Sequence, residues 1–170
     1  NKKYPDGVKL RKLDSKKIQL TNFIIMVGLP LFLLFSFVNE PIYRVVNAII
    51  FVIYLIALIR LRSSQEHLNY AIYSVIFGLY LSHTAAIFQG GIFNSGFLWF
   101  FLFPLFSVFL LGRHRGLTWI ALLLLTIVSS LVLILKLPIE VPYEPGYLIF
   151  MLLVLSIETS YVLFSHNIQL

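Results

Sequence analysis

The sequence predicts an all-α membrane protein, a polytopic bundle of six transmembrane helices with both termini in the cytoplasm. Three observations support this class: the composition is apolar, six long apolar runs follow one another, and the basic residues are distributed unevenly. Of the 170 residues, 59% are hydrophobic and 12% are charged, and the mean hydropathy is +0.92. Soluble domains contain roughly 45–50% apolar and about 25% charged residues. A water-soluble globule is therefore excluded, because so few polar side chains would not cover its core.

The six apolar runs are separated by short polar segments. A bilayer core requires roughly 20 apolar residues per helix, because each helical residue rises about 1.5 Å. The predicted spans are residues 18–38, 42–61, 68–88, 97–111, 117–135 and 147–164. No run has the charged start, short apolar stretch and cleavage site of a signal peptide, so we expect the first run to remain as a span.

Basic residues alternate between the two sides of the predicted spans. The amino-terminal segment and the second and fourth loops carry 11 Lys and Arg residues, whereas the other three loops carry only Arg44 and Lys136. Because cytoplasmic loops of membrane proteins are enriched in Lys and Arg, this distribution predicts a cytoplasmic amino terminus. Six spans would return the carboxyl terminus to the same side.

The spans divide the chain into three segments. Residues 1–17 form a basic cytoplasmic segment, of which residues 10–17 have the spacing of a helix lying on the membrane surface. Residues 18–164 form the membrane domain, and residues 165–170 resemble the start of a helical linker that leaves the membrane. We interpret the basic segment as a topological signal that also contacts anionic lipid, rather than as a binding site for nucleic acid.

Two ionisable residues lie inside the predicted spans. His83 is late in the third run and Glu158 is near the middle of the sixth. Ionisable groups are costly in hydrocarbon, so both are functional candidates that we expect to face the bundle interior or another chain. For Glu158, the alternatives are a switching role and a hydrogen-bonded polar clamp between helices. For His83, they are a ligand contact and a buried packing residue.

A glycine-rich element joins the third and fourth runs. It contains three glycines, an asparagine and a serine between apolar helices. Glycine lets a ligand approach the backbone closely, and irregular backbone below the membrane surface is tolerated only beside protein or a cavity. The alternative is a plain turn in which Asn94 or Ser95 caps the fourth helix. The candidate ligand-binding residues are His83, Gln89, Gly90, Gly91, Asn94, Phe97 and Trp99.

The sequence predicts no metal site and no catalytic site. Cysteine is absent, and the histidines at positions 67, 83, 114 and 166 are not spaced to place two on one helical face. There is no serine–histidine–aspartate set and no phosphate-binding loop. We therefore expect this segment not to be an enzyme.

The stretch from residue 83 to residue 119 resembles a known pattern. It combines His83, the glycine-rich element, Pro104, and the turn from Gly112 to Gly116 before Trp119. This is similar to the six-helix membrane sensor domains of bacterial histidine kinases and of related diguanylate and adenylate cyclases. One branch of these sensors responds to quinone and carries a Gly-Gly-x-x-Asn-Pro-Phe loop, and a second binds small hydrophobic autoinducers. The residues that match the quinone-type loop are Gly90, Gly91, Asn94 and Phe97, and Ser95-Gly96 replace its proline.

The resemblance implies a sensory domain in the bacterial inner membrane. A small hydrophobic ligand such as a quinone, or the redox or physical state of the membrane, would shift the packing of the helices. The sixth helix, with Glu158 as its signal-coupling residue, would pass the change to a histidine kinase or cyclase domain beyond residue 170. A homodimer is implied as well, since the outputs of these families act in pairs. The alternatives are a small transporter and a subunit of a membrane complex, although spans one to three are not repeated in spans four to six.

Overall fold

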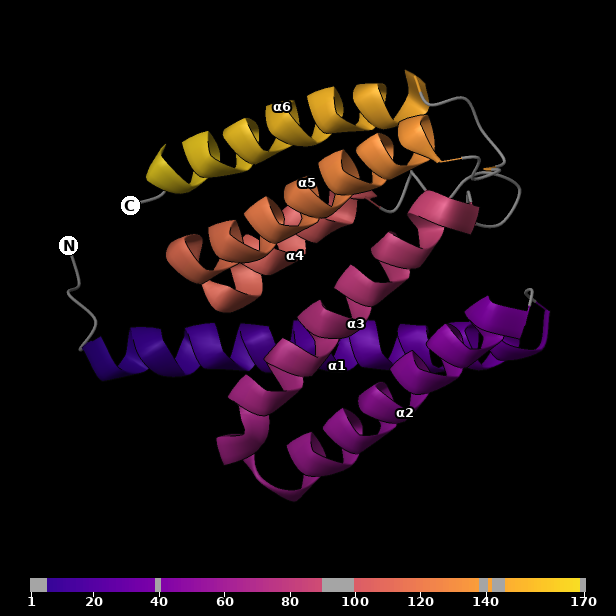
Figure 1. Ribbon diagram of the computed structural model, residues 1–170. Helices are drawn as coiled ribbons and strands as arrows, with labels where there is room; N and C mark the ends of the chain where they lie inside the picture. The colour runs from indigo at the N-terminus through magenta and orange to yellow at the C-terminus, as the bar shows by residue number, and fades with distance from the viewer. Residues whose placement is uncertain (1–5, 39–40, 90–99, 138–140, 142–145, 169–170) are drawn as a thin grey trace. The chain divides into compact units, whose positions relative to one another are not determined.

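The computed structural model describes residues 6–38, 41–89, 100–137, 141 and 146–168, and they are almost entirely helical (Figure 1). The expectation of an all-helical chain with six helices is confirmed within these ranges. The helices are α1 (Asp6–Val38), α2 (Pro41–Ser63), α3 (Leu68–Gln89), α4 (Leu102–Leu111), α5 (Arg113–Lys136) and α6 (Gly146–Ile168), with a short 3₁₀ helix, η1 (Gln65–His67), before α3.

Four of the described helices are long and apolar enough to cross a membrane. They comprise the stretch Asp14–Phe37 of α1, together with α2, α3 and α5. The described apolar stretches Leu102–Leu111 and Gly146–Val162, in α4 and α6, are shorter. The first three residues of the predicted fourth span, 97–99, lie outside the described residues. Helix α1 begins 12 residues before the predicted first span, so the basic segment 10–17 is helical and continuous with it.

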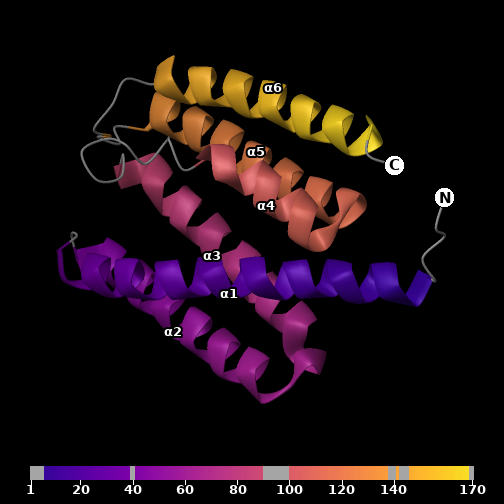
Figure 2. The ribbon, with the colours of Figure 1, turned by 180° about the vertical axis from the view of Figure 1, so that it is seen from behind.

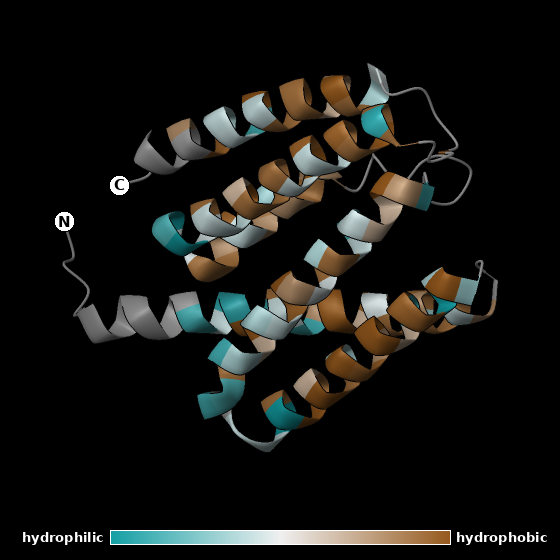
Figure 3. Ribbon diagram, in the orientation of Figure 1, coloured by the Kyte–Doolittle hydropathy of each residue, from teal (hydrophilic) through white to brown (hydrophobic). Residues whose placement is uncertain are grey.

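Large apolar side chains cover the outside of the helices. Figure 3 shows α2 as apolar along nearly its whole length, with hydrophilic residues at its last turn. Exposure of these side chains to water would be costly, whereas hydrocarbon solvates them. The backbone N–H and C=O groups are satisfied by the hydrogen bonds within each helix. A lipid bilayer is therefore the environment that these surfaces fit. The most exposed examples are Phe37, Ile42, Leu135, Ile157, Tyr161 and Phe164.

The chain divides into two compact units, residues 1–75 and 76–170, and α3 begins in the first and continues in the second. In the first unit, α1 packs on α2 through Tyr54, whose side chain is fully buried. The Tyr54 ring meets Phe32 edge-on at 5.4 Å between centroids. It also covers Gly28 so closely that an added Cβ would lie 2.7 Å from Tyr54 Cε2. The Tyr54 hydroxyl donates a hydrogen bond to the carbonyl oxygen of Val75, 3.1 Å away.

In the second unit, α4, α5 and α6 lie side by side, and each contacts the other two (Figures 1 and 2). The buried face of α5 repeats at alternating intervals of three and four residues, the spacing of a helix that packs along its whole length. It consists of Gly116, Ile120, Leu123, Ile127, Ser130 and Ile134. At Gly116, α5 approaches the backbone of α4, and an added Cβ would lie 2.7 Å from both Ser107 O and Val108 Cα.

The second part of α3 reaches α5 through aromatic and polar side chains. The Tyr80 hydroxyl lies 2.7 Å from Thr126 Oγ1, and the Tyr80 ring meets Trp119 at 5.8 Å between centroids. Phe77 meets Trp119 on the same helix pair at 6.4 Å. Hydrogen bonds between helices, such as the one between Tyr80 and Thr126, commonly contribute to helix packing in membranes.

Substitution of Gly116 by alanine should separate α4 from α5. Backbone atoms cannot move aside as a flexible side chain can, so we expect Gly116→Ala to lower the free energy of unfolding by about 1–3 kcal/mol. Titration with denaturing detergent, followed by circular dichroism, measures the change. Gly146→Ala is the matched control, because an added Cβ there meets no atom within 4 Å. Equal stability of the two variants would contradict the close contact.

Candidate functional site

The structure places three of the eight candidate residues, His83, Gln89 and Glu158. Gln89 is the last residue of α3 and is half-buried. The other five candidates, Gly90, Gly91, Asn94, Phe97 and Trp99, lie outside the described residues. The site that can be built from the described residues therefore centres on His83 and Glu158, both in the second unit.

His83 is buried between aromatic rings. Its side chain is 4% exposed, and its ring meets Phe100 at 4.6 Å between centroids with an interplanar angle of 78°. Phe103 lies on another side, at 5.4 Å and 58°. Nδ1 lies within hydrogen-bonding distance of the Leu79 carbonyl oxygen. Because a carbonyl oxygen can only accept, Nδ1 is the donor in this hydrogen bond.

The two phenylalanines are positioned by the beginning of α4. Phe100 and Phe101 form a 3₁₀ turn that leads directly into the helix at Leu102. Pro104 is the third helical residue, within the first turn, where its missing N–H would have no intrahelical partner in any case. Phe103 and Phe100 are 0% and 2% exposed. The proline therefore fits the start of the helix, and both rings are directed inward against His83.

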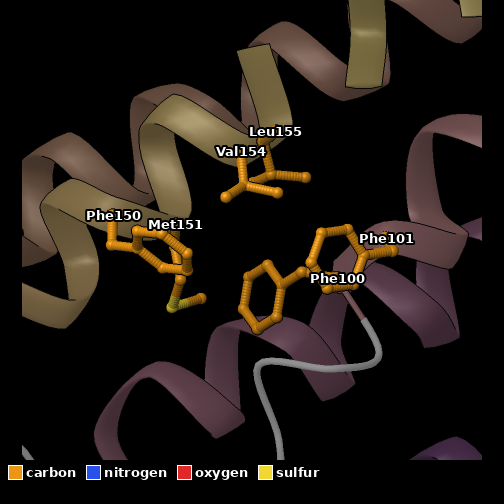
Figure 4. A pocket seen from close by; sticks show the side chains of 6 residues that line it. All are labelled: Phe100, Phe101, Phe150, Met151, Val154 and Leu155. Carbon is orange, nitrogen blue, oxygen red and sulfur yellow. The ribbon is translucent and has the colours of Figure 1, made fainter. Parts of the chain in front are cut away.

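Phe100 also lines an apolar indentation against α6 (Figure 4). Its other lining residues are Phe101, Phe150, Met151, Val154 and Leu155. Figure 4 shows the Phe100 ring standing opposite Met151, with Val154 and Leu155 closing one side. The indentation is shallow, with room for about one water-sized molecule, far below the volume of sites that hold drug-sized ligands. A larger apolar molecule would enter only by displacing Phe100 or the flexible Met151 side chain.

Glu158 lies on the packed face of α6. The buried residues of this helix include Leu148, Met151, Leu155 and Val162, and residue 158 occupies the intervening position of the same three-and-four spacing. Its atom Oε2 is buried and has no hydrogen-bond partner within the described part of the chain, and the same holds for Thr159 Oγ1. A buried polar atom without a partner costs about 1–3 kcal/mol. The expected hydrogen-bonded clamp is therefore not formed by Oε2 in this arrangement.

Phe100 lies between His83 and the indentation that faces α6, the helix that carries Glu158. On one side Phe100 contacts His83 of α3, and on the other it lines the indentation with Met151 and Leu155 of α6. Glu158 follows Leu155 by three residues, which is less than one helical turn along the same face. The sequence reasoning missed Phe100, Met151 and Leu155. The spacing of residues 148, 151, 155, 158 and 162 was a signal that could have shown the shared face of α6.

The described side chains do not form a metal-binding site. Among them, no three His, Asp or Glu residues gather in a way that could hold a metal ion. Comparisons with known protein families, curated proteins and solved structures gave no match to this chain. The proposals that follow therefore depend on the geometry of the site and on the pattern of the sequence.

Replacement of Glu158 by leucine should stabilise the protein. The substitution removes an unpartnered polar atom from an apolar helix contact, so we expect the free energy of unfolding to rise by about 1–3 kcal/mol. Leu155→Ala, on the same face of α6, is the comparison and should lower it by about 2 kcal/mol or more. Thermal unfolding in one detergent measures both changes. A Glu158→Leu protein less stable than the parent would show that the carboxyl group has a favourable partner.

Proposed function

We propose that the chain is a transmembrane sensory domain that detects a small hydrophobic ligand or the redox or physical state of the membrane. The signal would pass through α6 to a cytoplasmic kinase or cyclase domain. The observation that supports this proposal is the position of Phe100, which packs on the buried His83 and lines an indentation whose other wall is α6. A molecule that entered the indentation would contact Phe100 and α6 together.

The proposed threading has six spans with both termini in the cytoplasm of a bacterial inner membrane. It is supported by the four helices of sufficient length and by the excess of basic residues in alternate loops. Helix α4 is the element on which the six-span threading depends most, because its ten described residues extend only about 15 Å by helical rise. We therefore keep the fourth span as the apolar run 97–111 predicts it.

The proposed ligand is apolar with at least one hydrogen-bond donor or acceptor. The indentation is lined by hydrocarbon, aromatic and thioether groups, which select apolar surface, and the His83 imidazole packs on one of its lining residues, Phe100. A quinone has this combination of an apolar body and carbonyl acceptors.

Helix α6 is suited to a switching role because a buried polar atom on its packed face has no hydrogen-bond partner among the described residues. In a membrane no hydrophobic force drives helices together, so the position of a helix depends on close packing and on a few polar contacts. Glu158 lies on the packed face with Oε2 unpartnered, and a rotated α6 could supply that partner. Two arrangements close in free energy are what a ligand needs in order to shift a population. We include a homodimer in the proposal because paired α6 helices would bring paired output domains together.

Spin labels on α5 and α6 test the coupling through Phe100. The chain has no cysteine, so Leu122→Cys and Tyr161→Cys, both at exposed positions, would carry the only labels. A decyl-substituted quinone, or separately a total lipophilic cell extract, should shift the label distance by about 1–2 Å, the usual size of a signalling helix movement. Pulsed electron paramagnetic resonance in nanodiscs measures it.

Two phenylalanine variants make this test specific. Phe100→Ala should abolish the shift, whereas Phe109→Ala, at an exposed position of α4, should leave it intact. A shift that persists in Phe100→Ala would contradict the proposed coupling. No shift with either probe, combined with movement of the probe across vesicles, would favour a transporter.

A further inference from the structure

Basic side chains gather at one end of the α1–α2 pair. Helices α1 and α2 are consecutive and pack through Gly28 and Tyr54, so the amino-terminal part of α1 and the last turn of α2 lie at the same end. Lys16, Arg60 and Arg62 are exposed there, and Lys17 is half-buried. Figure 3 shows the hydrophilic residues of α1, of the last turn of α2 and of η1 at this end of the first unit.

These charges lie at similar depths along the pair. Counting from the Gly28–Tyr54 contact at about 1.5 Å per residue, Arg60 and Arg62 lie about 9 and 12 Å away, and Lys17 and Lys16 lie about 17 and 18 Å away. This spread of roughly 9 Å is slightly more than one headgroup layer, since the two layers add about 10–15 Å in total to a hydrocarbon core of about 30 Å, and long Lys and Arg side chains extend along the membrane normal to reach the headgroups. The four side chains can therefore reach the headgroups of the same leaflet.

Helix α1 is too long for the hydrocarbon core alone. Its 33 residues extend about 50 Å by helical rise, so its first turns continue beyond the apolar stretch. These turns add Lys9, Arg11 and Lys12 to the sequence of the same helix. The acidic side chains described at this end are Asp14 and Glu66. The basic ones are Lys16, Lys17, Arg60 and Arg62, so positive charge remains in excess.

One of these cations, Arg60, packs on an aromatic ring. The guanidinium of Arg60 lies over the Tyr70 ring, with Cζ 5.8 Å from the centroid. Such a contact restricts the arginine without neutralising it. The guanidinium keeps its charge and its planar set of donors, which match the geometry of a phosphate group.

We propose that this end of the α1–α2 pair is a binding surface for anionic phospholipid headgroups, with Lys16, Lys17, Arg60 and Arg62 as its contacts. Charge complementarity identifies the partner, because the same helices are surrounded by lipid and their cations lie at headgroup depth. Anionic headgroups attract basic residues next to a membrane span. The surface is separate from the His83–Phe100 site, and the proposal stands whether or not that site detects a ligand.

Native mass spectrometry of the purified protein with phosphatidylglycerol or phosphatidylcholine tests the proposal. Phosphatidylglycerol should bind more tightly, and the difference should fall in high salt. Each cation contributes about a fivefold change in affinity. Arg60→Gln/Arg62→Gln and Lys16→Gln/Lys17→Gln should therefore each weaken phosphatidylglycerol binding by about 30-fold. Arg44→Gln/Lys136→Gln removes the same charge elsewhere and should have little effect.

Three results would overturn the inference. The first is an equal loss of phosphatidylglycerol affinity in the control variant Arg44→Gln/Lys136→Gln, which would mean that net charge alone attracts the lipid. The second is binding of inorganic phosphate or of a short oligonucleotide as tightly as phosphatidylglycerol, with the same dependence on these residues. The third is unchanged phosphatidylglycerol affinity in the lysine pair, Lys16→Gln/Lys17→Gln. Helix content by circular dichroism verifies the fold of every variant.

Discussion

Close contacts at two glycines hold the helices together, because hydrocarbon provides no hydrophobic force between them. At Gly28 the Tyr54 ring takes the space of a side chain, and at Gly116 the backbone of α4 does so. Both contacts bring helices near enough for dispersion forces to act over long faces. Gly116 is itself part of the alternating three-and-four spacing on α5, because helices that approach closely must present one continuous face to each other.

The same environment explains why the polar residues stand out. His83 is accommodated by the Leu79 carbonyl oxygen and two phenylalanine rings, whereas Glu158 Oε2 has no partner among the described residues. A helix contact optimised for stability alone would have an apolar residue at position 158. The proposed sensory role gives a reason for the exception, since a helix that changes its packing requires contacts that are incompletely satisfied in one state.

Most of the fold could be predicted from the sequence, but less of the site. The ends of α2, α3, α5 and α6 lie within four residues of the apolar runs, because hydropathy directly reflects burial in lipid. Glu158 could be chosen because any carboxyl group in hydrocarbon is unusual. Phe100 could not be chosen, since sixteen phenylalanines look alike until tertiary packing brings one against His83. The glycine-rich element, where five candidate residues lie, stays a prediction.

The central claim is that all six helices cross the bilayer, including the short α4, so that α6 can carry a signal to the cytoplasm. Single cysteines at Leu137, after α5, and at His114, in the first turn of α5, test it most directly, since both positions are exposed and the parent chain has no cysteine. A membrane-impermeant maleimide applied to intact cells should label Leu137→Cys and leave His114→Cys unlabelled until the membrane is opened. The reverse pattern would mean that α4 does not cross or that the amino terminus is outside the cell, and either result would contradict the account.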